Sequence, residues 1–368
     1  MAFPEDPRIA LAQGRPIGEI ADRLGLEGLR KITATELAGP CPVCGGRDRF
    51  NINTARGVFL CRQCGGKGDG IALVRHTLGC SFPAALDYLE GQKVEIDPAE
   101  MERRRKRAAA SKAKLEADAA RYRARAIEDA RKIWARAERA EGSPVMAYLA
   151  ARAIRLDRPP VSLRYLPDHP FVKKIDKRYE TLHRGPCMIA AIQGRDDRLA
   201  AVHQTWLDLT RPDLNFKADI RDLKGERISA KMVRGSLKGG AIRLGGQKSE
   251  TLVMGEGIET TLSARVLDAV GPAEFWAGVS LGNMAGMMIK REGVRHSGEP
   301  DLSDEEAWIP PEWVRRLIFI RDGDSAKEMT FAKLRAGIGR AISTRPGLVG
   351  EIVDPGDGKD LNDLLRGQ

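Results

Sequence analysis

The pattern of hydrophobic and polar positions changes its character along the chain. Near the N-terminus, the short runs 49–53 and 57–60 predict two strands, and the amphipathic stretches 71–78 and 81–89 predict two helices after them. The following stretch, 101–141, is rich in Ala, Arg, Lys and Glu and has no Gly or Pro, which predicts one long helix. Its apolar positions are mostly Ala, so this helix has little with which to bury itself.

The second half of the chain predicts two kinds of sheet. Apolar runs at 186–192 and 199–206, with a turn between them at 194–197, predict an antiparallel hairpin. From residue 251 onward, strand patterns alternate with helix patterns, which favours a parallel sheet whose ligands bind beyond the carboxyl ends of the strands. We expect these strands at 251–255, 274–277, 316–320 and 349–353, with helices up to about 269 and over 325–342.

Composition narrows the class of protein. The length of 368 residues predicts several domains. No apolar run approaches the ~20 residues of a membrane-spanning helix, and the N-terminus lacks the pattern of a signal peptide. Six cysteines are too few for a disulfide scaffold, and four of them lie in two tight pairs, which indicates metal binding in a reducing compartment. We therefore expect a cytoplasmic protein with no membrane partner.

The net charge of +10 is unevenly distributed. Residues 1–100 carry −1, 101–141 carry +7, 142–250 carry +9 and 251–368 carry −5. A basic centre indicates a polyanionic partner. For the helix at 101–141 two interpretations stay open: a solvated linker, or a nucleic-acid contact through Arg103–Arg107.

The strongest chemical signal is a pair of Cys-x-x-Cys motifs. Cys41 and Cys44 are followed, after sixteen residues, by Cys61 and Cys64. Four thiolates presented by two tight turns suit tetrahedral Zn²⁺, and an all-protein ligand set makes the site structural. Glycines directly after each motif supply an open backbone. The alternative is four unrelated buried cysteines; Cys80 and Cys187 are interpreted as lone buried thiols.

The region containing these motifs resembles the N-terminal zinc-binding domain of bacterial and phage DNA primases. The likeness rests on the glycine-rich turn 65–70 with Asp69, the helix at 71–78 and the segment 81–89, and it covers about residues 38–90. All four ligands are Cys, as in several phage and plasmid forms. His76 is interpreted as a packed or surface residue rather than a fifth ligand. The resemblance implies contacts with a single-stranded template, which we assign to Arg49, Phe50, Phe59 and Arg62.

Three acids fall at the ends of predicted parallel strands. Glu256 follows the strand at 251–255, and Asp322 and Asp324 follow the strand at 316–320. Carboxylates of this kind bind Mg²⁺ or Mn²⁺, and two such ions can promote phosphoryl transfer. The alternative is that each acid caps a helix.

These residues match the Toprim domain shared by primases, topoisomerases and some nucleases. The signature is Glu256-Gly257 after the first strand and Asp322-Gly-Asp324 after a later one. The closing segment 358–365 resembles the last acidic motif of primase Toprim domains, which adds Asp360 to the expected magnesium ligands. The family often has an acid four residues after the Glu, where this chain has Thr260. Ligation by Glu259, Asp357 and Asp363 is left open.

The basic region before this domain resembles the subdomain that precedes Toprim in primase cores. Lys231, Arg234 and Lys238, among glycines, predict a mobile segment that binds nucleotide or template phosphates; the alternative is a solvated loop. The segment 240–249 is only faintly similar to a P-loop, because Gln247 replaces the glycine before the lysine.

The sequence thus predicts a multidomain chain of the α+β and α/β classes. We expect a zinc-binding domain over 1–95, a basic helical linker over 96–155, a mixed α+β subdomain over 156–250 and a Toprim domain with a Rossmann-like parallel sheet over 251–368. The leading hypothesis is a DNA primase that uses structural Zn²⁺ and catalytic Mg²⁺ or Mn²⁺, with Glu256, Asp322 and Asp324 as catalytic residues.

The expected partners are a single-stranded DNA template and ribonucleoside triphosphates. Because the chain stops soon after its last acidic motif, we expect a replicative helicase to act in trans, and we expect the gene to come from a mobile element or phage. The alternatives are a non-catalytic Toprim and zinc DNA-binding protein of recombination or repair, and a Toprim nuclease. A topoisomerase is disfavoured, because it needs a much larger chain with a nucleophilic Tyr.

Overall fold

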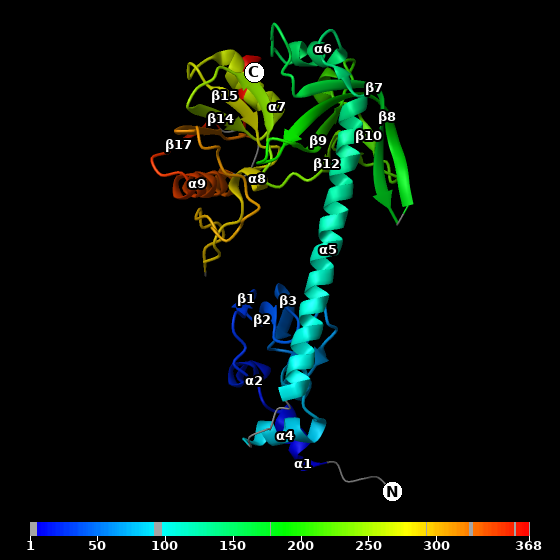
Figure 1. Ribbon diagram of the computed structural model, residues 1–368, viewed down its shortest axis with the longest axis vertical. Coiled ribbons are helices and arrows are strands. Elements are labelled where there is room, and N and C mark those ends of the chain that lie inside the picture. Colours follow the sequence, from blue (N-terminus) through cyan, green and yellow to red (C-terminus); the bar gives the residue numbers. More distant parts are fainter. Residues whose placement is uncertain are drawn as a thin grey trace. The chain divides into compact units, whose positions relative to one another are not determined.

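The computed structural model describes residues 6–91, 98–176, 178–291, 293–323, 327–356 and 358–367 (Figure 1). The chain divides into two compact units, residues 1–121 and residues 122–368. The predicted long helix is confirmed as α5 (Pro98–Arg136), which crosses the limit between the units but ends five residues before the predicted limit at 141. The side chains of Arg103, Arg104, Arg105 and Arg107 lie outside the described residues, and so does their predicted contact with nucleic acid.

Unit 1 contains a five-stranded antiparallel sheet whose strands follow chain order. Its strands are β1 (Arg30–Lys31), β2 (Glu36–Cys41), β3 (Gly45–Asn53), β4 (Val58–Cys61) and β5 (Lys67–Gly68). The helices of this unit that precede α5 are α1 (Pro7–Gln13), α2 (Ile17–Arg23), α3 (Gly70–Leu78) and α4 (Phe82–Glu90). The two predicted strands and two predicted helices correspond to β3, β4, α3 and α4, with β4 and α4 shifted by one residue from the predicted bounds.

Local sequence explains these elements. Side chains alternate along β3 and β4, so that Phe50, Ile52 and Phe59 are buried while Val58 and Leu60 are exposed. Helices α3 and α4 begin at side-chain caps from Asp69 and Ser81, and both end at a left-handed glycine. Their apolar faces complete one core with the sheet, which includes Leu73, Val74, Leu86 and Leu89.

The first sheet of unit 2 is antiparallel, in the order β12-β9-β8-β7-β6. Its strands are β6 (Glu138–Arg139), β7 (Leu163–Ile175), β8 (Arg178–Gln193), β9 (Leu199–Trp206) and β12 (Lys231–Gly235), and the predicted hairpin is β8–β9. Between β9 and β12 lie a 3-10 helix, η1 (Pro212–Leu214), and the small pair β10 (Ile220–Arg221) and β11 (Arg227–Ile228).

The two faces of this antiparallel sheet pack against different partners. On one face, Val202 and Trp206 of β9 share a core with Ala130 of α5. On the other face, Met188 and Ala190 share a core with α6 (Pro144–Ala151) and with the second sheet. Successive residues of a strand point to opposite faces, so the alternation in β8 and β9 places apolar side chains on both.

The second sheet of unit 2 has the order β13-β15-β14-β16-β17, and only the edge strand β13 is antiparallel to its neighbour. Helices cover both faces of this sheet: α7 and α10 pack on one face, and α8 and α9 pack on the other. The strands are β13 (Ile242–Gly246), β14 (Thr251–Gly255), β15 (Glu274–Ala277), β16 (Arg316–Ile320) and β17 (Val349–Val353). The helices are α7 (Ile258–Leu267), α8 (Leu281–Ala285), α9 (Lys327–Thr344) and α10 (Leu361–Leu365). The mostly parallel sheet is consistent with a Toprim domain.

The fold therefore agrees with the predicted class: a zinc ribbon followed by mixed α/β domains. The predicted domain limits stay a prediction. One strand inside the range 156–250, β13, pairs with the parallel sheet. Among the described helices, none combines the length and the hydropathy that crossing a bilayer requires.

Candidate functional sites: the cysteine cluster and the carboxylate edge

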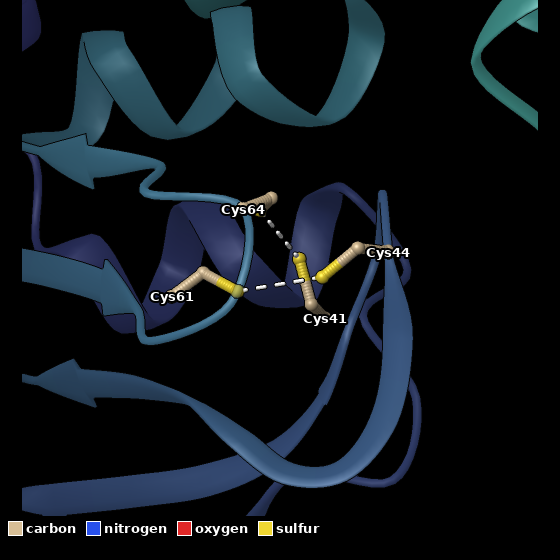
Figure 2. A group of neighbouring side chains, drawn as sticks. All are labelled: Cys41, Cys44, Cys61 and Cys64. Atoms are coloured by element: carbon tan, nitrogen blue, oxygen red, sulfur yellow. Dashed lines mark hydrogen bonds between the residues drawn. The ribbon is translucent and has the colours of Figure 1, made fainter. Parts of the chain in front are cut away.

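The four cysteine side chains converge at one end of the unit 1 sheet (Figure 2). The Sγ atoms all lie within 4.8 Å of one another, with 3.7 Å between Cys41 and Cys64 and 3.5 Å between Cys44 and Cys61. Four sulfurs bound tetrahedrally at ~2.3 Å from zinc stand about 3.8 Å apart. The donor set and its spacing thus fit a zinc ion, and with four protein ligands the cluster indicates a structural zinc site.

The cysteine thiols differ in their readiness to ionise. Burial raises the pKa of Cys41, and it raises the pKa of Cys64 to about 11. Burial acts in the same sense on Cys61, but backbone N–H groups of Cys64 and Gln63 outweigh it and lower the pKa of Cys61 to about 7. Because zinc binds the thiolate, the raised pKa values of Cys41 and Cys64 mean that loading the site displaces protons from both of these thiols.

His76 adjoins the cluster, and its ring packs on Phe50, in agreement with its interpretation as a packed residue; its closeness to two of the sulfurs was not predicted. Its Nε2 lies 3.4 Å from the Cys41 sulfur and 3.8 Å from the Cys64 sulfur. The ring also stacks on Phe50, at an interplanar angle of 7°. A side chain at Gly66 would come within 2.3 Å of the imidazole, so this glycine makes room for His76. The only signal in the sequence is that a helix carrying His76 follows the second Cys pair closely.

The predicted template contacts of the zinc ribbon are wrong for two residues. Phe50 and Phe59 are 0% and 3% exposed, with ring centroids 5.5 Å apart in the core of unit 1, so neither can stack on a base. They occupy the inward positions of the alternating strands β3 and β4. Arg62 is exposed and Arg49 is partly exposed.

In unit 2, the parallel sheet places Glu256 and Asp322 on the same side, at the carboxyl ends of its strands; we call this side of the sheet the carboxylate edge. Strands β14 and β16 are parallel neighbours, with Met254 opposite Phe319, and each is followed at its carboxyl end by one of these acids. Both acids are partly exposed. The Thr260 hydroxyl donates a hydrogen bond of 3.0 Å to Oδ1 of Asp322, which links the start of α7 to the segment after β16.

The other predicted acids have different positions. Asp324 and Asp357 lie outside the described residues. Asp360 caps α10, where its carboxylate accepts from the Asp363 backbone N–H at 2.8 Å and Asp363 accepts from the Asp360 N–H at 3.0 Å. Asp360 thus has the helix-capping role that was the alternative to metal binding. In the part of the chain that the structure describes, the four cysteines are the one group of three or more ligands that converges.

Glu259 lies in a buried cluster of charges rather than at the sheet edge. Its carboxylate is 3.4 Å from the ammonium groups of both Lys217 and Lys231, and it accepts a 2.5 Å hydrogen bond from the Tyr148 hydroxyl. Burial alone would raise its pKa, but Lys231, Lys217 and Arg152 together hold the pKa of Glu259 well below its usual range. Glu259 is therefore an ionised partner of lysines.

Two segments of the chain match known protein families. Residues 36–71, which include all four cysteines, match the family described as the zinc-binding domain of primase-helicase. Unit 1 thus carries a primase-type zinc-binding domain. Residues 124–244, which run from α5 into β13, match a second family, described as a domain of unknown function.

Solved primase structures resemble the chain that carries this primase-type domain. The zinc-binding and RNA polymerase domains of the Aquifex aeolicus primase match at 14% identity and a TM-score of 0.33, over 98% of this chain and 82% of that one. A DNA primase domain from Pseudomonas aeruginosa matches at 13% identity and a TM-score of 0.34, over 62% of this chain and 69% of that one. The primase fragment of the bacteriophage T7 primase-helicase protein matches at 12% identity and a TM-score of 0.27, over 90% of this chain and 94% of that one.

The basic residues that were predicted to bind phosphates are not brought together as one group. The segment predicted to be mobile is in part a strand, β12, which pairs with β9. Strand alternation places Lys231 on the face with Glu259, whereas Arg234 points to the opposite face and pairs with Asp129 of α5 at 2.9 Å. Lys238 pairs with Glu306.

Proposed function

We propose that this protein is a DNA primase, which synthesises short RNA primers on single-stranded DNA by metal-dependent nucleotidyl transfer. The observation that carries the proposal is that Glu256 and Asp322 follow neighbouring strands of a mostly parallel sheet at their carboxyl ends, in a chain that also has a primase-type zinc-binding domain. Ligands of open parallel sheets bind at this edge.

The carboxylate edge suits hard divalent cations. Glu256 and Asp322 offer oxygen ligands, and both side chains are partly exposed. We propose Asp324 as a third ligand and catalytic residue on its sequence position alone. Bound Mg²⁺ or Mn²⁺ would supply positive charge to the reacting phosphates. The hydrogen bond from Thr260 fixes the orientation of the Asp322 carboxylate.

Positive charge for the nucleotide comes from the neighbouring cluster in our proposal. Lys217, Lys231 and Arg152 surround the single carboxylate of Glu259, so the cluster keeps an excess of positive charge. The side chain of Lys231 is 35% exposed, which leaves its ammonium group within reach of a triphosphate. Phosphate oxygens attract such cations without regard to base sequence.

The test is a priming assay with the full chain, single-stranded DNA, four ribonucleotides and Mg²⁺ or Mn²⁺. We expect short RNAs on a denaturing gel, and we expect Asp322→Ala to reduce their yield at least 100-fold, on the order of the loss when a transition-state electrostatic contact is removed. The exposed Asp157 provides a matched control, because Asp157→Ala removes an acid of the same unit that follows α6 and not a strand of the parallel sheet.

Two outcomes would contradict the proposal. An unchanged yield in Asp322→Ala would exclude this carboxylate from the reaction. Cleavage of labelled DNA with metal and no nucleotides, in place of RNA synthesis, would identify a nuclease instead.

A further inference from the structure

Unit 2 has a groove on the side of the antiparallel sheet that packs against α5. The groove has a volume of about 1100 Å³ and lies between the C-terminal part of α5 and strands β7, β8, β9 and β12. Its wall includes Arg234, whereas Lys231 of the same strand points to the opposite face, toward Glu259. The groove is therefore separated from the Glu259 cluster by the thickness of the sheet.

The charge of the groove is positive. Its lining includes the cations Arg125, Lys132, Arg136 and Arg234 but only one acid, Asp129, among the residues described. Asp129 is already neutralised by Arg234, at 2.9 Å. The three other cations lie on α5 at positions i, i+7 and i+11, which places them along one side of the helix. A linear polyanion could follow such a row.

Two tyrosines of the groove are exposed to an unusual degree. Tyr122 of α5 and Tyr179 of β8 are 77% and 67% exposed. The same lining includes the apolar side chains of Ile133, Val172 and Met232. Aromatic rings beside apolar surface and a row of cations are what bases and phosphates of an unpaired strand require, since bases stack on rings while cations follow the backbone.

The groove lining also includes an uncharged pair, His169 and Gln204, which are largely buried and hydrogen-bonded to each other. His169 lies 2.6 Å, through its Nε2, from Oε1 of Gln204. Burial lowers the pKa of His169, so at neutral pH the imidazole is uncharged and its Nε2–H donates to the amide oxygen. A duplex would present its phosphates outward and keep its bases stacked, so it could not use the tyrosines.

We propose that this groove binds single-stranded nucleic acid, with Tyr122 and Tyr179 as stacking platforms and Arg125, Lys132 and Arg136 as phosphate contacts. The choice of a nucleic-acid occupant rests on the proposed function. The groove itself adds a second surface, on the side of the sheet away from the Glu259 cluster, where the strand is held by contacts independent of base sequence.

The test is equilibrium binding of a fluorescently labelled single-stranded oligonucleotide to the full zinc-loaded chain, measured by anisotropy without nucleotides or added divalent metal. We expect Tyr179→Ala and Tyr122→Ala each to weaken binding about 5- to 150-fold, the range for one stacked base. Tyr179→Phe keeps the ring and should bind like the wild type. Loss of affinity in the Phe variant equal to that in the Ala variant would exclude stacking.

The cations are tested by the salt dependence of binding. In the double variant Lys132→Ala and Arg136→Ala, the slope of log K against log salt concentration should fall by about 1.4, because each phosphate contact with a single strand contributes ~0.7. The matched control is Arg131→Ala with Arg139→Ala, which removes two exposed arginines from the same region outside the groove lining. Equal effects of the two pairs would overturn the proposal.

Further outcomes separate this inference from the proposed function. Affinity unchanged in all groove variants would show that the strand is held elsewhere, for instance by unit 1, and duplex DNA binding as tightly as the single strand would exclude a groove for unpaired bases. If the groove variants weaken binding while the wild type makes no RNA, the groove is supported and the primase proposal fails.

Discussion

Glu259 and Glu256 stand close together in the sequence, yet their surroundings differ. Glu256 lies in the turn after β14 and is partly exposed, whereas Glu259 belongs to the first turn of α7 and is buried. A carboxylate in such a place stays ionised only because Lys217, Lys231 and Tyr148 surround it. The sequence motif alone does not show this, since the lysines come from other segments of the chain.

Replacing Glu259 tests this role. Glu259→Gln keeps the shape of the side chain but leaves Lys217 and Lys231 without a counter-charge, so we expect the free energy of unfolding to fall by about 3–5 kcal/mol. Urea denaturation followed by circular dichroism measures the change. Glu256→Gln is the matched control and should alter stability by less than about 1 kcal/mol. A Glu259→Gln variant with normal stability would contradict the buried cluster.

His203 makes the same cluster sensitive to acid. Burial, with Lys231 and Lys217 nearby, lowers the pKa of His203 to about 4, while Glu259 acts in the opposite sense. In the unfolded chain this imidazole binds a proton near pH 6.5, whereas in the folded chain it does so only near pH 4. The contribution of His203 to the free energy of unfolding is therefore fully present above pH 6.5 and is lost as the pH drops toward 4.

We expect this residue to account for a loss on the order of 3 kcal/mol between pH 6.5 and 4. Denaturation at several pH values compares the wild type with His203→Gln, which cannot titrate. The difference between the two stability curves isolates this one group from the carboxylates. Parallel curves for the two proteins would mean that His203 is not buried in its neutral form.

At the scale of elements, regular patterns are predicted well. The predicted strands 199–206, 274–277, 316–320 and 349–353 have the bounds of β9, β15, β16 and β17. Apolar runs between turn residues define the first three of these strands, which are mostly buried, whereas β17 lies at the edge of the sheet and is partly exposed. The zinc ligands follow from their spacing for a similar reason: each Cys pair is local in the sequence.

Elements that depend on distant partners were not predicted correctly. The segment 231–235 contains two cations and a glycine, which favoured a mobile loop, but pairing with β9 makes it a strand. In this strand Lys231 and Val233 point to one face of the sheet, and Met232 and Arg234 point to the other. Because each face takes one cation and one apolar residue, this pattern does not predict a strand unless both faces are known to be covered. The separation of the predicted basic residues onto two faces follows from that pairing.

Gly323 shows how one element constrains another. It lies between Asp322 and Asp324, and a side chain there would come within 1.9 Å of the Lys359 carbonyl oxygen and 2.6 Å of that of Gly356. Its own carbonyl accepts from the Gly358 N–H at 3.0 Å. The close approach of two backbones, rather than a need to bend, explains the glycine.

Gly323→Ala should therefore displace the segment after β17 together with Asp322. We expect a destabilisation of about 1–3 kcal/mol, as for overpacking elsewhere, and a loss of priming larger than this change in stability would explain. Gly282 in α8 is the matched control, since a Cβ there meets nothing within 4 Å and helical Ala is favoured over Gly. Thermal melts and the priming assay measure both effects, and equal behaviour of the two variants would contradict the contact with Lys359.

For the whole molecule, the charge of +10 is a poor description. The basic excess falls within residues 101–250, whereas residues 251–368, which contain the parallel sheet apart from β13, carry −5. A protein that binds nucleic acid needs positive charge beside the phosphates. In the acidic segment 251–368, the proposed bound metal ions would supply this charge in place of basic side chains. The two units also have separate cores, and only the core of unit 1 includes the cysteines of the cluster.

That separation predicts how the protein responds to zinc removal. Cys41 and Cys61 are part of the unit 1 core with Phe50 and Ile52, and structural zinc contributes ~10–16 kcal/mol in small zinc modules, more than the net stability of a small domain. Chelation should therefore unfold unit 1 while unit 2 keeps its structure. Hydrogen exchange with mass spectrometry should show lost protection in β3 and α3 and unchanged protection in β8, β14 and β16. Cys64→Ser should give the same pattern without chelator, because it removes one ligand. Protection lost in both units together would mean that the two cores fold as one.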